Sequence, residues 1–217
     1  SDCLVGSEMC IRDSTKPNYL RTVQNSLNRN LRLTTIEDNR ELVRISLLRA
    51  IQTYPDNTVF PELLVWHFTQ IRDFASSVVH AKALDLRLDE QGVRLMELGN
   101  TAQANGDTET ALACYRYVAS KGPLNPYYFT ARNEVLQVRF EDLTSSVPAD
   151  LDAMASLAEE YAASLRDLGV RSETAMMVKD RAHLLAFYLQ RSREGIDALE
   201  SLLNENNLNE RVAAACK

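Results

Sequence analysis

The sequence is poor in residues that interrupt secondary structure, with only 7 glycines and 6 prolines among 217 residues. A protein built from many short strands needs such residues at its frequent turns. Alanine, leucine, glutamate and arginine are abundant instead, and these residues lose little side-chain freedom in a helix. The composition therefore favours an all-α fold.

A membrane-spanning segment and an excess of positive charge are also lacking. No stretch approaches the roughly 18 to 20 uninterrupted apolar residues that cross a bilayer. The formal net charge is −6, whereas binding to nucleic-acid phosphates requires clustered Lys and Arg. We therefore expect no membrane insertion and no nucleic acid as a partner.

Familiar catalytic and metal-binding motifs are missing as well. The chain has no G-x-S-x-G, no phosphate-cradling Gly-rich loop and no H-E-x-x-H. The histidines, His67, His80 and His183, have no His, Cys or paired carboxylate at metal-ligand spacing, so we interpret them as packing or surface residues. Cys114 lies in an apolar helical stretch and is interpreted as a small buried hydrophobe. These absences predict a non-catalytic protein without cofactor or metal ion.

What the chain does contain is an internal repeat, clearest over residues 95–123. Its characteristic positions are Leu98, Gly99, Ala111, Tyr115 and Val118. The small side chains of Gly99 and Ala111 would let two helices of one hairpin approach closely. This pattern resembles the tetratricopeptide repeat, a 34-residue helical hairpin.

The same pattern recurs at earlier positions in steps of 34 residues. The first step backward gives Leu64, Val65, Ser77, Ala81 and Leu84, which keep an apolar or small character. The turn at residues 71–74 then takes the place of the turn at residues 105–108. A second step reaches a helix that ends just before Pro55. Three units in register predict TPR-like repeats over residues 36–123.

The resemblance implies an all-α, right-handed superhelical solenoid of antiparallel helix hairpins. Residues 124–206 would continue it as degenerate TPR-like hairpins. Residues 15–35 are interpreted as a remnant of a preceding helix or a linker, and residues 207–217 as the start of a truncated next helix. Thr34 and Glu37 match a capping box at the beginning of the first complete helix.

The first fourteen residues are expected to be foreign to the natural protein. The string from Leu4 to Ser14 is similar to the in-frame translation of a sequencing-library adapter, so residues 1–14 are interpreted as a non-native tail. The true N-terminus would then be missing, which leaves the compartment open. The repeats resemble those of large, often exported tetratricopeptide proteins from Bacteroidota-like bacteria, which favours a periplasmic setting over a cytoplasmic one.

In tetratricopeptide proteins the first helices of successive hairpins line a concave groove that receives a peptide or a partner helix. The resemblance implies that the groove-facing residues are Trp66, Thr69, Gln70, Met96, Asn100, Gln103, Tyr127, Glu134 and Gln137. Trp66 is the anchor candidate because aromatic residues concentrate binding energy at interfaces, although packing between hairpins is an equal alternative. Asn100 matches the asparagine of members that bind a terminal carboxylate. Met96 and Ala104 replace the basic residues of that clamp, so no such clamp is expected.

Two classes of function follow from these observations. The first is a scaffold or adaptor that binds a segment of another protein on the concave face. The alternative is a targeting or regulatory repeat module of a larger enzyme whose catalytic domain lies outside this chain. Self-association of the repeats is a third, weaker possibility.

Overall fold

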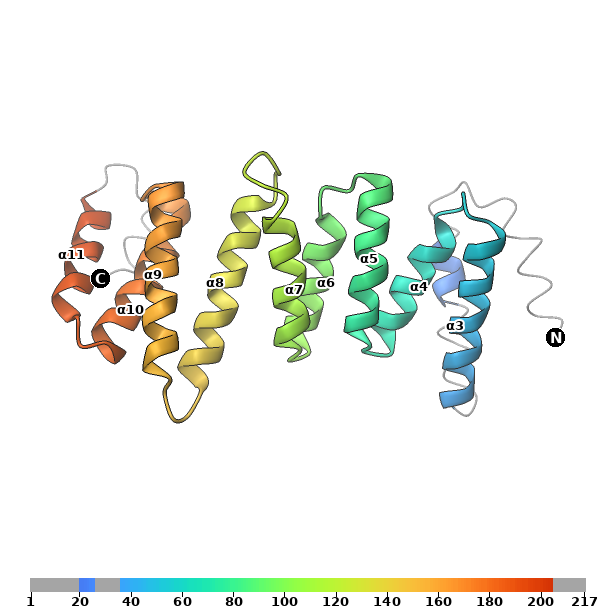
Figure 1. Cartoon of the computed structure of the whole chain (residues 1–217), viewed down its shortest axis with the longest axis horizontal. Coiled ribbons are helices and arrows are strands. Elements are labelled where there is room, and N and C mark those ends of the chain that lie inside the picture. The colour runs from blue at the N-terminus through green and yellow to red at the C-terminus, as the bar shows by residue number, and fades with distance from the viewer. Residues whose placement is uncertain (1–19, 26–35, 205–217) are drawn as a thin grey trace. The chain divides into compact units, whose positions relative to one another are not determined.

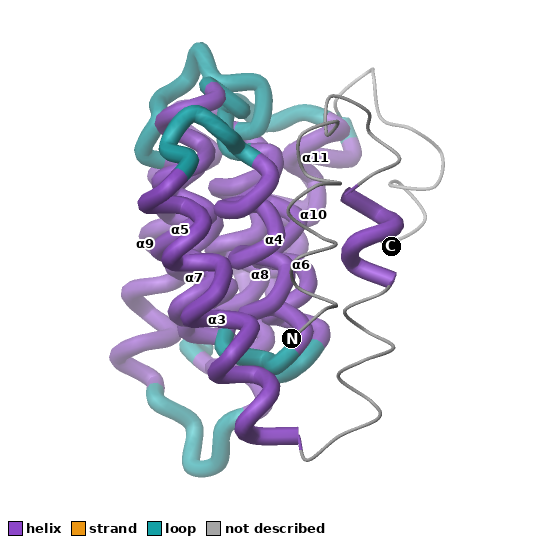
Figure 2. The backbone as a smooth tube through the Cα atoms, turned by 90° about the vertical axis from the view of Figure 1, so that its right-hand side faces the viewer, coloured by secondary structure: helices purple, strands orange, loops and turns teal. Residues whose placement is uncertain are grey.

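The computed structural model describes residues 20–25 and 36–204, and every regular element that these residues form is a helix (Figures 1 and 2). The long helices are α3 (Ile36–Thr53), α4 (Val59–Gln70), α5 (Phe74–Leu88), α6 (Val93–Ala104), α7 (Thr108–Ala119), α8 (Tyr128–Ser145), α9 (Leu151–Leu168), α10 (Ala175–His183) and α11 (Ser192–Leu203). A 3-10 turn, η1 (Ser172–Thr174), precedes α10, and a π-helical segment, η2 (Leu184–Tyr188), continues it. The all-α prediction is confirmed. Among the described helices, none is both long and apolar enough to cross a membrane.

The chain divides into two compact units, which are described separately. Unit 1 extends to Ala102 and unit 2 begins at Gln103, so the division falls inside α6. The predicted segments 1–14 and 207–217 lie outside the described residues, as does Thr34 of the predicted capping box. Within the predicted helix remnant at residues 15–35, residues 20–25 are helical.

The turns that precede α5 and α7 have the same backbone geometry. Arg72 and Gly106 adopt positive φ angles of 61° and 81°. The aspartate that follows each of them caps the next helix: Asp73 and Asp107 accept a hydrogen bond from the N–H three residues on, at 3.1 Å and 3.0 Å. Because the two turns are 34 residues apart, the correspondence predicted between them is confirmed.

Helix α4 is the central element of unit 1 and packs against both α3 and α5. The buried cluster between α3 and α4 consists of Leu47, Phe60, Leu63, Leu64 and Phe68. Leu20 and Val23, from the helical segment at residues 20–25, pack against this cluster and are partly buried. The segment before α3 therefore contributes to the core of unit 1.

Small residues let paired helices approach closely in both units. In the hairpin of α4 and α5, the fully buried Ser77 hydroxyl donates to the backbone carbonyl of Val65 at 3.1 Å. In the hairpin of α10 and α11, a Cβ atom added to Gly195 would lie 3.0 Å from the carbonyl oxygen of Ala182. Each crossing brings a carbonyl of the first helix against a small residue of the second. Ser77, which occupies a small-residue position of the repeat, and Gly195 thus mark helix crossings.

The core of unit 2 lies between α8, α9, α10 and η2. Its buried side chains are Leu136, Met154, Leu157, Ala158, Tyr161, Met177, Leu184 and Leu185. Phe129, at the beginning of α8, packs against this cluster. Helix α11 covers α10 through Leu202, which forms a second buried group with Ala175 and Val178.

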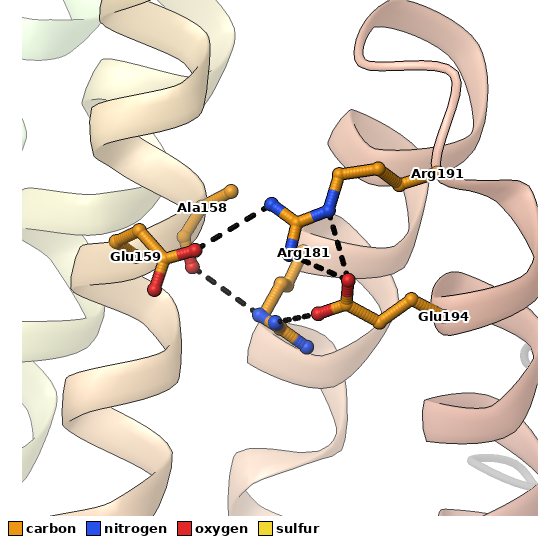
Figure 3. Close-up of polar contacts among 5 residues, drawn as sticks. All are labelled: Ala158, Glu159, Arg181, Arg191 and Glu194. Atoms are coloured by element: carbon orange, nitrogen blue, oxygen red, sulfur yellow. Dashed lines mark hydrogen bonds and ion pairs between the residues drawn. The ribbon is translucent and has the colours of Figure 1, made fainter.

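Ion pairs join α9 to the last hairpin of unit 2 (Figure 3). Arg181 and Arg191 both bind the carboxylate of Glu194, each at 2.5 Å. Arg181 also donates to the carbonyl of Ala158 at 3.2 Å, and Arg191 lies 3.6 Å from the carboxylate of Glu159. Partly exposed pairs of this kind contribute about 0.2 to 1 kcal/mol each. The apolar core therefore supplies most of the stability of this region.

Candidate functional site

An open groove in unit 1 is lined by α4, α6 and the helical segment at residues 20–25. Its volume is about 230 Å³, and its lining residues are Leu20, Gln24, Glu62, Val65, Trp66, Thr69, Arg94, Glu97, Leu98 and Thr101. Each of the two helices contributes residues spaced three or four apart, which lie on one helix face. Val65 and Leu98 are buried, with 6% and 5% of their surface exposed, whereas Trp66 is half-buried. The groove thus combines a buried apolar lining, a partly accessible indole ring and polar groups around them.

The groove carries an excess of negative charge. Glu90 binds the guanidinium of Arg94 through two contacts, Oε2 to Nε at 2.8 Å and Oε1 to Nη2 at 2.5 Å. This pairing, together with the nearby carboxylates of Glu62 and Glu97, raises the pKa of Arg94. Within the described residues, neither Glu62 nor Glu97 forms an ion pair of its own. Arg94 is therefore the cation that three carboxylates share.

The threonine hydroxyls of the groove donate to their own helices. Thr69 donates to the carbonyl of Val65 at 2.9 Å, and Thr101 donates to the carbonyl of Glu97 at 2.9 Å. Bonds of this kind to the preceding turn occupy the only hydrogen of each hydroxyl. The Thr69 hydroxyl also lies 2.9 Å from the Ser77 hydroxyl, so it is engaged within the hairpin of α4 and α5.

His67 lies on α4 but belongs to the core and not to the groove. Its side chain is fully buried, and neither ring nitrogen has a hydrogen-bond partner. Burial lowers the pKa of His67, and Arg40 and Arg44 of α3 act in the same direction. The backbone of Arg40, which approaches the ring without meeting hydrogen-bond geometry, and the carboxylate of Glu41 oppose this shift. Burial therefore favours the neutral form of the imidazole.

The other two histidines also pack against aromatic rings. His80 stacks on Phe68 with ring centroids 5.5 Å apart, and His183 meets Phe140 edge-on at 5.5 Å. The interpretation of the histidines as packing residues is confirmed. Cys114 is fully buried, as predicted. In the part of the chain that the structure describes, no three His, Cys, Asp or Glu side chains are arranged to hold a metal ion.

Polar residues of unit 2 gather around Glu141 on α8. The side-chain amides of Gln103 and Gln137 donate to its carboxylate at 3.3 Å and 2.9 Å. Gln103 also accepts a hydrogen bond from the Tyr115 hydroxyl at 3.1 Å. Glu134 is half-buried, and its burial, with the charge of Glu141, raises the pKa of Glu134. This group, the Glu141 cluster, is a second acidic surface.

The predicted partner-binding residues thus divide between the two surfaces. Trp66 and Thr69 line the groove of unit 1. The predicted members of the Glu141 cluster in unit 2 are Gln103, Glu134 and Gln137.

The remaining predicted residues differ in accessibility. Gln70 and Asn100 are exposed, and Tyr127 is half-buried where its N–H bonds the Asn125 side chain at 2.8 Å. Met96 is only 7% exposed, so its side chain is packed in the interior and is not accessible to a partner.

Sequence reasoning missed the charged half of the groove, namely Glu62, Arg94 and Glu97. One signal was available, because Glu62 lies one helical turn before Trp66 and therefore on the same face. Arg94 and Glu97 gave no comparable signal, since the 34-residue register relates equivalent positions and not positions that face each other. Glu141 was missed for the same reason.

Comparison with known proteins does not assign the chain to a family. No protein-family model matches the sequence, and no curated protein matches it either.

Proposed function

We propose that this chain is a non-catalytic scaffold of the tetratricopeptide type, a solenoid of hairpins whose first helices bind a segment of a partner protein. The single observation that carries the proposal is the groove between α4 and α6, which contains the half-buried ring of Trp66. Aromatic side chains in partly desolvated grooves provide the largest contributions at protein interfaces. The repeated turns at Arg72 and Gly106 and the small-residue crossings support the repeat architecture.

The polar groups of the groove suit binding better than reaction. Arg94 is engaged by Glu90, and the threonine hydroxyls donate to backbone carbonyls. These groups can orient a bound chain by charge and hydrogen bonding.

The test is to select peptides from a random library on the immobilised full chain and to titrate the selected peptides by calorimetry. We expect Trp66→Ala to raise the dissociation constant by about thirtyfold, the loss of one interface hot spot of about 2 kcal/mol. Thr101→Trp, which fills the groove from an exposed position, should abolish binding without touching the core. Leu86→Ala is the matched control, because Leu86 is 73% exposed on α5 and does not line the groove.

Selected peptides that bind Trp66→Ala and Thr101→Trp as tightly as the unchanged chain would disprove the proposed site. Circular dichroism of each variant identifies any loss of helix, so a folding defect is not mistaken for a binding defect.

A further inference from the structure

The helices α4 and α6 carry different kinds of residue at equivalent repeat positions. A step of 34 residues along the chain relates Phe60 to Arg94, Leu63 to Glu97 and Leu64 to Leu98. On α4, the first members of these pairs are buried in the core, where Leu20 and Val23 of the preceding helical segment pack against them. On α6, two of the three equivalent positions are charged, and they line the groove. The α6 residues that line this groove are therefore partly ionic, whereas the equivalent α4 residues are apolar and belong to the core.

Negative charge exceeds positive charge in this groove. Arg94 is bound by Glu90 through two contacts, which leaves Glu62 and Glu97 without a cation of their own among the described residues. Glu62 is half-buried and Glu97 is exposed beside this apolar lining, so water solvates both carboxylates when the groove is empty. A positively charged ligand group would relieve this imbalance.

Trp66 provides the complementary apolar surface for such a group. Its ring is half-buried in the same groove as both carboxylates, and Glu62 lies one turn before it on α4. The face of an indole ring attracts a guanidinium or ammonium group, and tryptophan does so best among the aromatic residues. The oxygen acceptors around the ring match the donors of arginine and lysine, which have no acceptor of their own.

We propose that the groove of unit 1 binds a basic segment of a partner protein, with an arginine or lysine side chain over Trp66 and between Glu62 and Glu97. This inference rests on the proposed function and specifies the chemistry of the partner. The Glu141 cluster of unit 2 agrees with it independently, because Glu134 and Glu141 also lack a cationic partner among the described residues. A segment rich in Arg or Lys would thus meet negative charge both in the groove of unit 1 and at the Glu141 cluster of unit 2.

The single tryptophan of the chain makes the test direct. Fluorescence excited selectively at tryptophan reports on Trp66 alone, so a peptide that enters the groove changes the emission. The probes are a short peptide of alternating Arg and Ala and one of alternating Glu and Ala, of equal length. We expect the Arg-Ala peptide to shift the emission saturably and the Glu-Ala peptide to leave it unchanged. Salt at about 1 M, where the screening length is about 3 Å, should remove most of the effect.

Charge variants separate a local site from general attraction to an acidic protein. We expect the double variant Glu62→Gln and Glu97→Gln to weaken binding of the Arg-Ala peptide roughly tenfold. The matched control, Asp197→Asn with Glu200→Gln on exposed positions of α11, changes the net charge equally and should leave the affinity unchanged. Equal losses in the two double variants, or equal binding of the Glu-Ala peptide, would overturn the proposal.

The two proposals fail in different ways. If library-selected peptides bind through Trp66 but are not basic, and the Arg-Ala peptide leaves the emission unchanged, the groove is a binding site of another specificity and the basic-segment proposal is wrong. If no library peptide binds in a manner that depends on Trp66, the proposed function fails as well.

Discussion

Replacing His67 with leucine should make unit 1 more stable, although it removes a side chain from the centre of a hairpin. The imidazole is fully buried, and neither of its nitrogens has a hydrogen-bond partner. The neutral ring carries one N–H donor and one acceptor nitrogen. Leaving a buried polar group unsatisfied costs about 1 to 3 kcal/mol. Leucine has a similar volume and no polar atom, so we expect His67→Leu to stabilise unit 1 by about 2 kcal/mol at pH 7, net of the lost contact with Phe68.

Acid should enlarge this difference. Burial lowers the pKa of His67 below the ordinary value near 6.5, so the unfolded chain binds the proton more readily than the folded chain. Stability therefore falls as the pH drops below about 6.5, and the loss ends only below the folded-state pKa. The leucine variant lacks this loss, so its advantage should be larger at pH 5 than at pH 7.

Urea unfolding at pH 7 and pH 5, followed by Trp66 fluorescence, measures both quantities. The fluorescence isolates unit 1, because Trp66 lies on α4 and is the single tryptophan of the chain. His183→Leu is the matched control, since His183 packs in unit 2 and should not alter the Trp66 transition. A His67→Leu variant that is no more stable at pH 7, or that shows the same pH dependence as the unchanged chain, would refute the reasoning.

Three further substitutions test the backbone and the core of the described helices by urea unfolding and circular dichroism. Arg72→Gly should stabilise unit 1 by about 1 kcal/mol, because a positive φ of 61° disfavours any residue with a Cβ atom; no change would show that the turn is unstrained. Gly195→Ala should destabilise unit 2 by about 1 to 2 kcal/mol, since the new Cβ would lie 3.0 Å from the Ala182 carbonyl, and this outweighs the better helix propensity of alanine; a stabilised variant would contradict the close crossing. Asp180→Asn should stabilise unit 2 by up to about 3 kcal/mol at pH 7, because burial raises the pKa of Asp180 to about 6 and the ionised form is disfavoured above that pH. The folded carboxyl regains its proton as the pH falls, so the advantage should vanish near pH 4; an advantage that persists there would have another cause.

Local signals in the sequence were sufficient for the helices and their turns. Asp73 and Asp107 each cap a helix by binding the N–H three residues on. Such caps depend only on neighbouring residues, so the two turns, 34 residues apart, can be recognised in the sequence. Helix α9 carries local signals of the same kind, namely the spacing of its apolar residues and Gly169 at its end. Burial of Cys114 followed from its apolar neighbours on the same helix.

Contacts between helices decided which residues share a surface and which are buried. The sequence by itself determined an all-α chain with repeated turns and small residues at helix crossings, because caps, positive φ angles and helical periodicity are properties of short segments. Only the tertiary structure decided that Glu62, Arg94 and Glu97 share one groove, that His67 is buried without a partner, and that Met96 is inaccessible. A repeat period identifies equivalent positions in successive helices, but the rotation of each helix against its neighbour depends on the packing of side chains distant in sequence.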